Sequence, residues 1–599
     1  MRPAAERPLK PTWLRLIGIS ALALLLTTYA WWPMFQAYPK TPEEDGRHFF
    51  FQFETVKAAI RTYHELPLWN PFDCHGIPLW NHPESMAGAP ILLLTVWLST
   101  TVTTILWNAL HVAAGFVAMW LLARDDLKLT RLAAFVASAM WAFGVAHTSQ
   151  YGGEHASLAG FLYAPLLLFL WRKAEASWDA RVGLGLVIAL LVYEGATYPL
   201  PYTLLVLGLE TLTRVWRWRR LTNIVLAGFT VAAVGVVLSA ARLLPLIDEL
   251  AAHKRPMEAD FDHLWHIRSL IDMYVLRTPH WRARFVDQQY VFGEYISYIG
   301  WLGVALVILG MAVSAAEHLW LLVLSVLIFV FMLGHFAPWA PYTFLQAHVL
   351  PFRSMRVPSR YRILLLVNLC LYVGLAVDRV PELFRQNLGM PSIARALRAA
   401  LVGCALIATG DTVGLGQEIL AYRFNGAPEL PVARAARFHY GGAGLTPDFI
   451  DQPRQNTAWL GCRHSTWAFE ADAPLWTGDV PQARSLGAGA IVRVESRTHN
   501  TFTIDVEVNE PSRIVLNSAW DRGWTTDVGT VVENADKLLA VDLPVGHHEV
   551  HARYWPRYLT LGFWTSAVGM LAVMVFFLRR RLIGHGNGKA TARTLPRRP

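Results

Sequence analysis

The sequence has few charged residues: Asp, Glu, Lys and Arg make up only 16% of its 599 residues, whereas hydrophobic residues make up 54%. This balance excludes an ordinary soluble enzyme and predicts a polytopic membrane protein. The net charge of +9 does not indicate nucleic-acid binding, because the basic residues cluster at the ends of apolar segments and in the C-terminal tail. We therefore expect a lipid bilayer as a partner, and no nucleic acid.

Cysteine is also scarce. The four cysteines, Cys74, Cys370, Cys404 and Cys462, show no CxxC spacing and no paired histidines, so a zinc site or a thiol relay has no support. Cys370 and Cys404 fall in apolar segments, where we expect buried side chains. The sequence leaves open whether Cys74 and Cys462 form a disulfide.

Several nucleotide-binding and hydrolase motifs are absent. The sequence contains no Walker loop, no GxGxxG after a predicted strand and no GxSxG. Nucleotide, dinucleotide and serine-hydrolase chemistry therefore lack support.

Long apolar segments dominate the chain. Since a bilayer core needs about 20 apolar residues per helix, the sequence predicts about twelve transmembrane helices. They lie near residues 13–35, 99–123, 130–147, 157–171, 182–197, 199–213, 222–242, 298–314, 319–336, 360–378, 396–416 and 557–578. Lys and Arg cluster before the first segment and after the second, fourth, sixth, tenth and last, which places both termini in the cytoplasm. Three large segments, 36–98, 243–297 and 417–556, then lie on the opposite side.

The last of these outer segments changes character. Apolar and polar residues alternate, as in TFTIDVEV, and Asn, Asp, Pro and Gly separate the runs. This pattern predicts an extracytoplasmic antiparallel β-sandwich over 417–556, between a helical transmembrane domain over 1–416 and a final helix with a basic tail over 557–599. The sandwich either binds an acceptor glycan or packs over the active site, and the strand-and-turn spacing of its tryptophans favours packing.

Acidic residues lie close to the predicted membrane surface in two outer connections. Glu43, Glu44 and Asp45 follow the first apolar segment by a few residues, and Glu154 stands beside His155 between the third and fourth segments. A carboxylate at this depth can act as a general base for an acceptor hydroxyl or as a metal ligand. The alternative for the first group is a solvated acidic turn. Two acids from two outer connections indicate a site shared between them.

Four arginines, Arg353, Arg356, Arg360 and Arg362, cluster at the outer end of the tenth apolar segment, on the side that short connections normally keep poor in arginine. Guanidinium groups bind phosphate through two parallel hydrogen bonds. An anionic lipid head group such as a polyprenyl phosphate or diphosphate therefore accounts for this placement. The alternative is contact with ordinary lipid phosphates. Arg356 and Arg360 are favoured, because a proline fixes the chain between them.

Four parts of the chain resemble one protein family. They read ELPLWNPFDCHGIPLWNHPES, YISYIGWLGVALVILG, LPFRSMRVPSRYRIL, and SAWDRGWTTDVG followed by VDLPVGHHEVHARYWP. In this order they resemble the YfhO-like bacterial membrane proteins, which belong to the GT-C class of integral-membrane glycosyltransferases. The resemblance implies a GT-C-like helical core and the inverting transfer of a sugar from a polyprenyl-phosphate-linked donor.

The resemblance also implies roles for individual residues. An acid in the first outer connection serves the reaction, which indicates Asp45 or the adjacent Glu44, and Glu154 is similar to an acid in the second connection of the class. The arginine cluster would bind the donor phosphate. Some members of the class need a divalent cation such as Mg²⁺ or Mn²⁺, for which Asp45 and Glu154 would be the ligands, and the sequence does not decide this point.

The segment PLWNPFDCHGIPLWN lies in the first outer connection. Its prolines stiffen the chain, so its aromatic and amide side chains can form a wall for the sugar or the acceptor. With two histidines, the residues of this predicted wall are Trp69, Asn70, Trp80, Asn81, His82 and His155. The alternative is a loop that its tryptophans anchor at the lipid head groups.

The sequence thus predicts a glycosyltransferase of the bacterial cytoplasmic membrane, whose active site faces the periplasm or the exterior and whose acceptor is an envelope glycan, lipid or polymer. A lipid-linked glycan flippase or exporter and a non-catalytic envelope assembly protein are the alternatives. A flippase would carry polar residues through the membrane, and the predicted helices contain few of them. The sequence does not specify the sugar, the acceptor or the oligomeric state.

Overall fold

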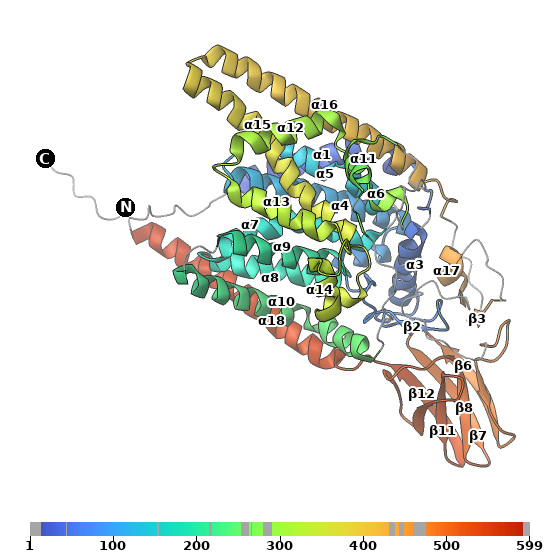
Figure 1. The fold of residues 1–599 in the computed structure, drawn as a ribbon. Helices are drawn as coiled ribbons and strands as arrows, with labels where there is room; N and C mark the ends of the chain where they lie inside the picture. Colours follow the sequence, from blue (N-terminus) through green and yellow to red (C-terminus); the bar gives the residue numbers. More distant parts are fainter. Residues whose placement is uncertain are drawn as a thin grey trace.

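The computed structural model describes residues 13–43, 45–152, 155–214, 218–252, 263–264, 266–278, 290–429, 438–441, 449–458 and 475–590. Glu44, Glu154 and Cys462, which carry predictions from the sequence, lie outside these residues. Within them the chain forms a bundle of long helices with a β-domain at one end (Figure 1).

The bundle is built from apolar helices. Their bounds are α1 (Trp13–Ala30), α4 (Thr100–Trp120), α5 (Arg131–Ala142), α7 (Ala164–Ala174), α8 (Trp178–Tyr193), α9 (Pro199–Arg214), α10 (Trp218–Ala252), α12 (Gly300–Ser314), α13 (Leu319–Met332), α15 (Tyr361–Leu388), α16 (Pro391–Arg423) and α18 (Leu559–Ala590). Each segment that the sequence predicts to cross the membrane overlaps one of these helices, although α7 covers only the second half of segment 157–171.

Local signals set the ends of several helices. The Ser99 hydroxyl accepts a hydrogen bond from the backbone N–H of Val102 and so caps the start of α4, and Thr130 caps α5 in the same way. Such caps satisfy backbone donors that have no partner inside the helix. α15 ends at Gly389, whose φ of 63° is the left-handed conformation that glycine adopts without a steric penalty.

The helical core has the dimensions of a multi-pass membrane protein. Six of its helical segments are long and apolar enough to cross a membrane: Thr100–Asp126, Arg131–Gln150, Leu221–Ala252, Pro358–Asn387, Pro391–Arg423 and Leu559–Arg580. Three further apolar helices are shorter: Leu14–Ala30, Gly300–Ser314 and Leu319–Met332. The chain is therefore a membrane protein with several spans, and the predicted number of twelve crossings stays a prediction.

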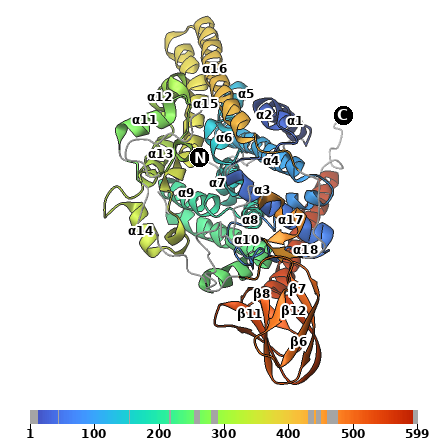
Figure 2. The same cartoon turned by 90° about the vertical axis from the view of Figure 1, so that its right-hand side faces the viewer.

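Short elements fill the end of the bundle that carries the β-domain. They are α2 (Trp32–Gln36), α3 (Asp45–Lys57), a π-helical turn (Ala58–Thr62), the hairpin of β1 (Trp69–Asn70) and β2 (Ile77–Pro78), α6 (Val145–Gln150), α11 (Ile267–Val275), a 3-10 turn (Phe292–Glu294), α14 (Pro341–His348) and α17 (Gln452–Gln455). The labelled elements α3, α6, α11 and α17 lie at this end in Figure 1, and this end faces the viewer in Figure 2. The described parts of the predicted outer segments 36–98, 243–297 and 417–556 thus share one side of the core.

The β-domain consists of two antiparallel four-stranded sheets. One has the strand order β10-β11-β8-β5 and the other β6-β7-β12-β9. The strands are β5 (Ala483–Ser485), β6 (Ala490–Arg497), β7 (Thr501–Val508), β8 (Ser512–Ala519), β9 (Trp524–Thr526), β10 (Thr530–Glu533), β11 (Leu538–Leu543) and β12 (Gly546–Tyr554).

Alternation along β7 explains how the two sheets pack. Phe502, Ile504, Val506 and Val508 are buried, and the residues between them are not. They form one apolar cluster with residues of the facing sheet, as expected for an antiparallel sandwich. The sheet domain predicted from the sequence is present, but helix α16 continues to Arg423 and so extends past the predicted domain boundary at residue 416.

The cysteines divide into two classes. Cys74 is disulfide-bonded, whereas Cys370 and Cys404 are free thiols. Cys370 is fully buried, as predicted for a core residue, and Cys404 is partly exposed. Cys462 lies outside the described residues, so its pairing with Cys74 stays a prediction.

Candidate functional site

Asp45 is the first residue of α3, and 69% of its side chain is exposed. Its Oδ2 atom lies 3.5 Å from Nε2 of His155, which belongs to the connection between α6 and α7. The first turn of a helix stabilises negative charge through its free N–H groups. The structure therefore brings together the two connections in which the sequence predicts a shared site, with an accessible carboxylate from one and an imidazole from the other.

The next charged pair lies close to His155. The Ser149 hydroxyl and the Gln150 side-chain amide donate hydrogen bonds to the Gly293 carbonyl, at 3.0 and 2.8 Å, and so hold the 3-10 turn that ends at Glu294. Burial alone would raise the pKa of Glu294, but the guanidinium of Arg360, with a further contribution from His155, outweighs burial and lowers this pKa to about 2. Glu294 is therefore ionised at neutral pH and acts electrostatically on His155.

The predicted phosphate-binding arginines occupy three different environments. Arg360 is buried, donates two hydrogen bonds to Glu294 at 2.7 and 3.1 Å, and lies over the Tyr198 ring at 4.4 Å. Arg356 is half-buried, and Arg353 is exposed. Because the guanidinium of Arg360 already binds a carboxylate, its prediction as a phosphate ligand does not fit this arrangement, and Arg356 and Arg353 are the accessible members.

Arg362 is a different case. Its side chain is fully buried, and none of its three guanidinium nitrogens has a hydrogen-bond partner in the described part of the chain. Its charge acts electrostatically on Glu294 and on the buried ring of His147. A buried guanidinium without hydrogen bonds is costly, so this position favours an additional anionic partner.

The first half of the predicted sugar wall is packed against the β-domain. Trp69 is fully buried, and its ring contacts the rings of Trp524 at 5.4 Å and Tyr554 at 4.6 Å. Its backbone N–H donates a hydrogen bond to the Asn500 side chain at 3.1 Å. Asn70 is buried beside it. These residues join the first connection to the sandwich.

The second half of the wall packs against α10. Trp80 donates a hydrogen bond to the Ala241 carbonyl at 2.9 Å, the Asn81 amide donates to Glu249 at 2.8 Å, and His82 is buried next to them. An indole face that is covered by protein cannot stack on a sugar. The wall predicted from Trp69, Asn70, Trp80, Asn81 and His82 is therefore closed in this structure, and only His155 lies at Asp45.

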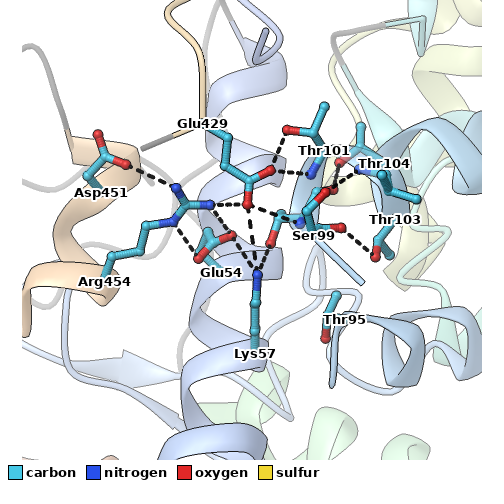
Figure 3. Close-up of polar contacts among 12 residues, drawn as sticks. Glu54, Lys57, Thr95, Ser99, Thr101, Thr103, Thr104, Glu429, Asp451 and Arg454 are labelled. Atoms are coloured by element: carbon cyan, nitrogen blue, oxygen red, sulfur yellow. Dashed lines mark hydrogen bonds and ion pairs between the residues drawn. The ribbon is translucent and has the colours of Figure 1, made fainter. Parts of the chain in front are cut away.

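A buried charge network at the far end of α3 is not predicted from the sequence (Figure 3). Arg454 of α17 donates to both carboxylate oxygens of Glu54, at 2.8 and 2.7 Å, and to Glu429 at 2.5 Å. Burial would lower the pKa of Arg454, but its carboxylate partners raise it above the usual value. Residues of α3, α17 and the segment after α16 are thereby held together.

Glu429 also caps α4 within this network. Its carboxylate accepts hydrogen bonds from the backbone N–H groups of Thr100 and Thr101, at 3.3 and 3.0 Å, and from the Thr101 hydroxyl at 2.6 Å. Burial would raise the pKa of Glu429, and these donors together with Arg454 lower it. The sequence indicates only one contact of this network: Glu54 and Lys57 are three positions apart, a spacing that places them on one face of a helix.

The helical core contains a second pair that the sequence did not reveal. His111 of α4 and Glu194, which follows α8, are both buried, and His111 Nε2 lies 3.2 Å from Glu194 Oε1. A lone histidine in an apolar segment gives no sign of its partner. The helices therefore carry more buried polar groups than their sequences indicate.

The described residues contain no group of three or more His, Cys, Asp or Glu side chains that could hold a metal ion. Of the two predicted metal ligands, Asp45 and Glu154, the second lies outside these residues. Asp45 is therefore the one carboxylate of the predicted metal site that the structure places.

Comparisons with known proteins found only remote similarity. No family model and no curated protein matches the chain, so membership of the YfhO-like family stays a prediction. A cryo-EM structure of the arabinofuranosyltransferase AftD from Mycobacteria is similar over 91% of this chain and 40% of that chain, with 16% identity and a TM-score of 0.46. The structure of an AftD mutant is similar over 91% of this chain and 42% of that chain, with 16% identity and a TM-score of 0.43. The chain spans about two fifths of the length of these chains, and similarity at this level establishes neither a shared fold nor a shared activity.

Proposed function

We propose that the chain is a membrane glycosyltransferase of the GT-C type. It transfers a sugar from a polyprenyl-phosphate-linked donor to an envelope glycan or lipid acceptor, on the face of a bacterial cytoplasmic membrane that carries the β-domain. Both termini then lie in the cytoplasm. The observation that carries this proposal is the contact between the exposed carboxylate of Asp45 and the imidazole of His155, at the end of an apolar helical core.

The proposed chemistry is a direct displacement. Asp45 accepts the proton of an acceptor hydroxyl, and the hydroxyl oxygen attacks the anomeric carbon of the donor sugar. The bond between that carbon and the phosphate oxygen breaks, the phosphate leaves with the electron pair, and the configuration inverts. His155 positions the carboxylate.

The leaving phosphate needs positive charge where its own charge develops. Arg362 supports this role, because it is buried and its guanidinium lacks hydrogen bonds to described residues. Arg356, half-buried in the same cluster, is the second candidate. In this assignment Arg360 neutralises Glu294, and Arg362 and Arg356 contact the phosphate.

Asp45→Asn tests the proposal. General base catalysis contributes about 10²- to 10⁴-fold, so purified Asp45→Asn in reconstituted membranes should lose sugar transfer from a lipid-linked donor by that factor. Asp179→Asn is the matched control, because Asp179 also lies in the first turn of a helix and is half-exposed, but pairs with Arg580 on α18. Transfer by Asp45→Asn at the rate of the unmodified protein would overturn the assignment.

The buried His111–Glu194 pair favours a second candidate, a flippase for lipid-linked glycans, because ionisable residues inside a helical core mark translocation pathways. The two candidates differ in their response to substitution. A flippase keeps its activity in Asp45→Asn and loses it in His111→Gln, when movement of a fluorescent lipid-linked sugar across proteoliposomes is measured. A transferase loses sugar transfer in Asp45→Asn.

A further inference from the structure

A cavity of about 350 Å³ opens between the C-terminal end of α3 and α17. Its lining residues are Glu54, Lys57, Ala58, Arg61, Thr62, Pro453 and Arg454. Its volume is in the range of small-molecule sites, and part of its wall is a π-helical turn, a rare conformation that often occurs at functional sites. The cavity lies about 18 Å along α3 from Asp45, at 1.5 Å per residue.

Each of the acidic groups around the cavity already has Arg454 as a partner. Arg454 pairs with Glu54 and Glu429 through the hydrogen bonds described above and lies 3.6 Å from Asp451 (Figure 3). Glu429 also accepts two backbone N–H groups at the start of α4, where the helix dipole favours negative charge. The carboxylates therefore have partners without the remaining two cations of the wall.

Lys57 is one of these two cations. Its side chain is 11% exposed, and its Nζ atom lies 3.8 Å from an oxygen of Glu54 and 3.8 Å from an oxygen of Glu429. Its hydrogen bond to the Thr100 hydroxyl measures 3.4 Å. These distances exceed those of strong charge-assisted hydrogen bonds, so an anion at closer range would be a stronger partner for the ammonium group.

Arg61 is the second cation. It is exposed at the cavity and makes no hydrogen bond or ion pair with any residue in the described ranges. It follows Lys57 by four residues across the π-helical turn, and both side chains line the cavity. The wall of the cavity thus presents two adjacent cations, of which Arg61 has free donors and Lys57 has only long contacts.

We propose that this cavity binds an anionic oxygen-bearing group, a carboxylate or a phosphate, of the acceptor, between Lys57 and Arg61. This inference rests on the proposed function, which supplies the acceptor, but the cavity is separate from the Asp45 site. An acceptor that reaches both sites is held by its anionic group while its hydroxyl lies at Asp45. The cavity therefore selects acidic acceptors over neutral ones.

Binding without a donor tests the proposal independently of catalysis. The full chain in detergent is titrated calorimetrically with glucuronate, inorganic phosphate and, as the neutral analogue, glucose. We expect saturable binding of at least one of the two anions, none of glucose, and an affinity about tenfold lower in Arg61→Gln, which corresponds to about 1.4 kcal/mol. The anion that binds more tightly shows whether the cavity takes a carboxylate or a phosphate of the acceptor.

Three variants make the result specific. Arg493→Gln removes an exposed arginine of β6 and should leave the affinity unchanged. Arg362→Gln removes binding of phosphate at the donor site and should leave glucuronate binding unchanged. Because Arg61 is exposed, Arg61→Gln should unfold at the temperature of the unmodified protein. Equal affinities of Arg61→Gln and the unmodified protein, or the absence of saturable binding of either anion, would overturn this inference, whereas loss of transfer in Asp45→Asn tests only the proposed function.

Discussion

Arg360 donates two hydrogen bonds to the carboxylate of Glu294, at 2.7 and 3.1 Å, although the sequence places Arg360 among four apparently equivalent arginines. This ion pair joins the segment before α12 to the start of α15. Arg362, two residues later, is buried without a described hydrogen bond. Residues two positions apart do not share a face of a helix, and here the two neighbours have different roles: one holds the structure and the other is available for an anion.

Loss of one partner of the Arg360–Glu294 pair should destabilise the protein. Arg360→Gln leaves a buried carboxylate without its counter-charge, which costs about 3–5 kcal/mol in comparable cases. The measurement is the free energy of unfolding of the purified protein in detergent. The double variant Glu294→Gln/Arg360→Gln removes both charges and should recover most of this loss, and a double variant no more stable than Arg360→Gln would contradict the pairing.

The same pair predicts a dependence of stability on pH. The pKa of Glu294 is lowered from its ordinary 4.5 to about 2 in the folded protein, so its stabilising contribution is complete above pH 4.5 and disappears as the pH falls toward 2. Unfolding temperatures between pH 7 and pH 3 should therefore fall more steeply for the unmodified protein than for Glu294→Gln/Arg360→Gln. Parallel curves would show that Glu294 does not contribute.

Arg362 should be needed for activity and not for stability. Arg362→Gln removes positive charge from the leaving phosphate and should lower kcat by about 10²- to 10³-fold, as for other groups that stabilise developing charge. Its unfolding temperature should stay equal or rise, because an uncompensated buried charge is removed. Arg268→Gln is the control, since Arg268 is 89% exposed on α11 at the same end of the core. A variant that is less stable and equally active would contradict this role.

The joint between the first connection and the β-domain should depend on Trp69. Trp69→Ala removes a fully buried indole that contacts Trp524 and Tyr554, and substitutions of this kind cost about 3–5 kcal/mol. Faster proteolysis of the β-domain and a lower unfolding temperature would report the loss. Trp97→Ala should change stability by less than about 0.5 kcal/mol, because Trp97, in the same connection, is 75% exposed.

Much of the fold follows from periodicity, which is a local property. Apolar runs located the helices, and alternation in TFTIDVEV located β7 and its sandwich. Both patterns depend on neighbours in sequence. The helix ends were less accurate: α16 runs to Arg423, because a helix that leaves the bilayer can continue with polar residues.

The candidate site depends on contacts between distant residues, and most of these could not be predicted. Arg454 and Glu54 are separated by 400 positions, and neither lies in a recognisable motif. The approach of Asp45 to His155 could be anticipated from the sequence, because both lie close to the membrane surface on one side of the predicted membrane. The burial of Trp69 could not be predicted, because the composition of its loop fits a loop anchored at the lipid head groups as well as a loop packed against the β-domain.

The π-helical turn Ala58–Thr62 has a consequence for how this end of the molecule is aligned. A π-helical turn accommodates one residue more than an α-helical turn, and an α-helix rotates by about 100° per residue. Deleting one residue here would convert the turn to an α-helical one, in which Arg61 would follow Lys57 by three positions, a spacing that still shares one face of a helix. The turn thus takes up one extra residue while Arg61 stays at the cavity and Glu65 stays bonded to the Thr498 hydroxyl at 2.8 Å.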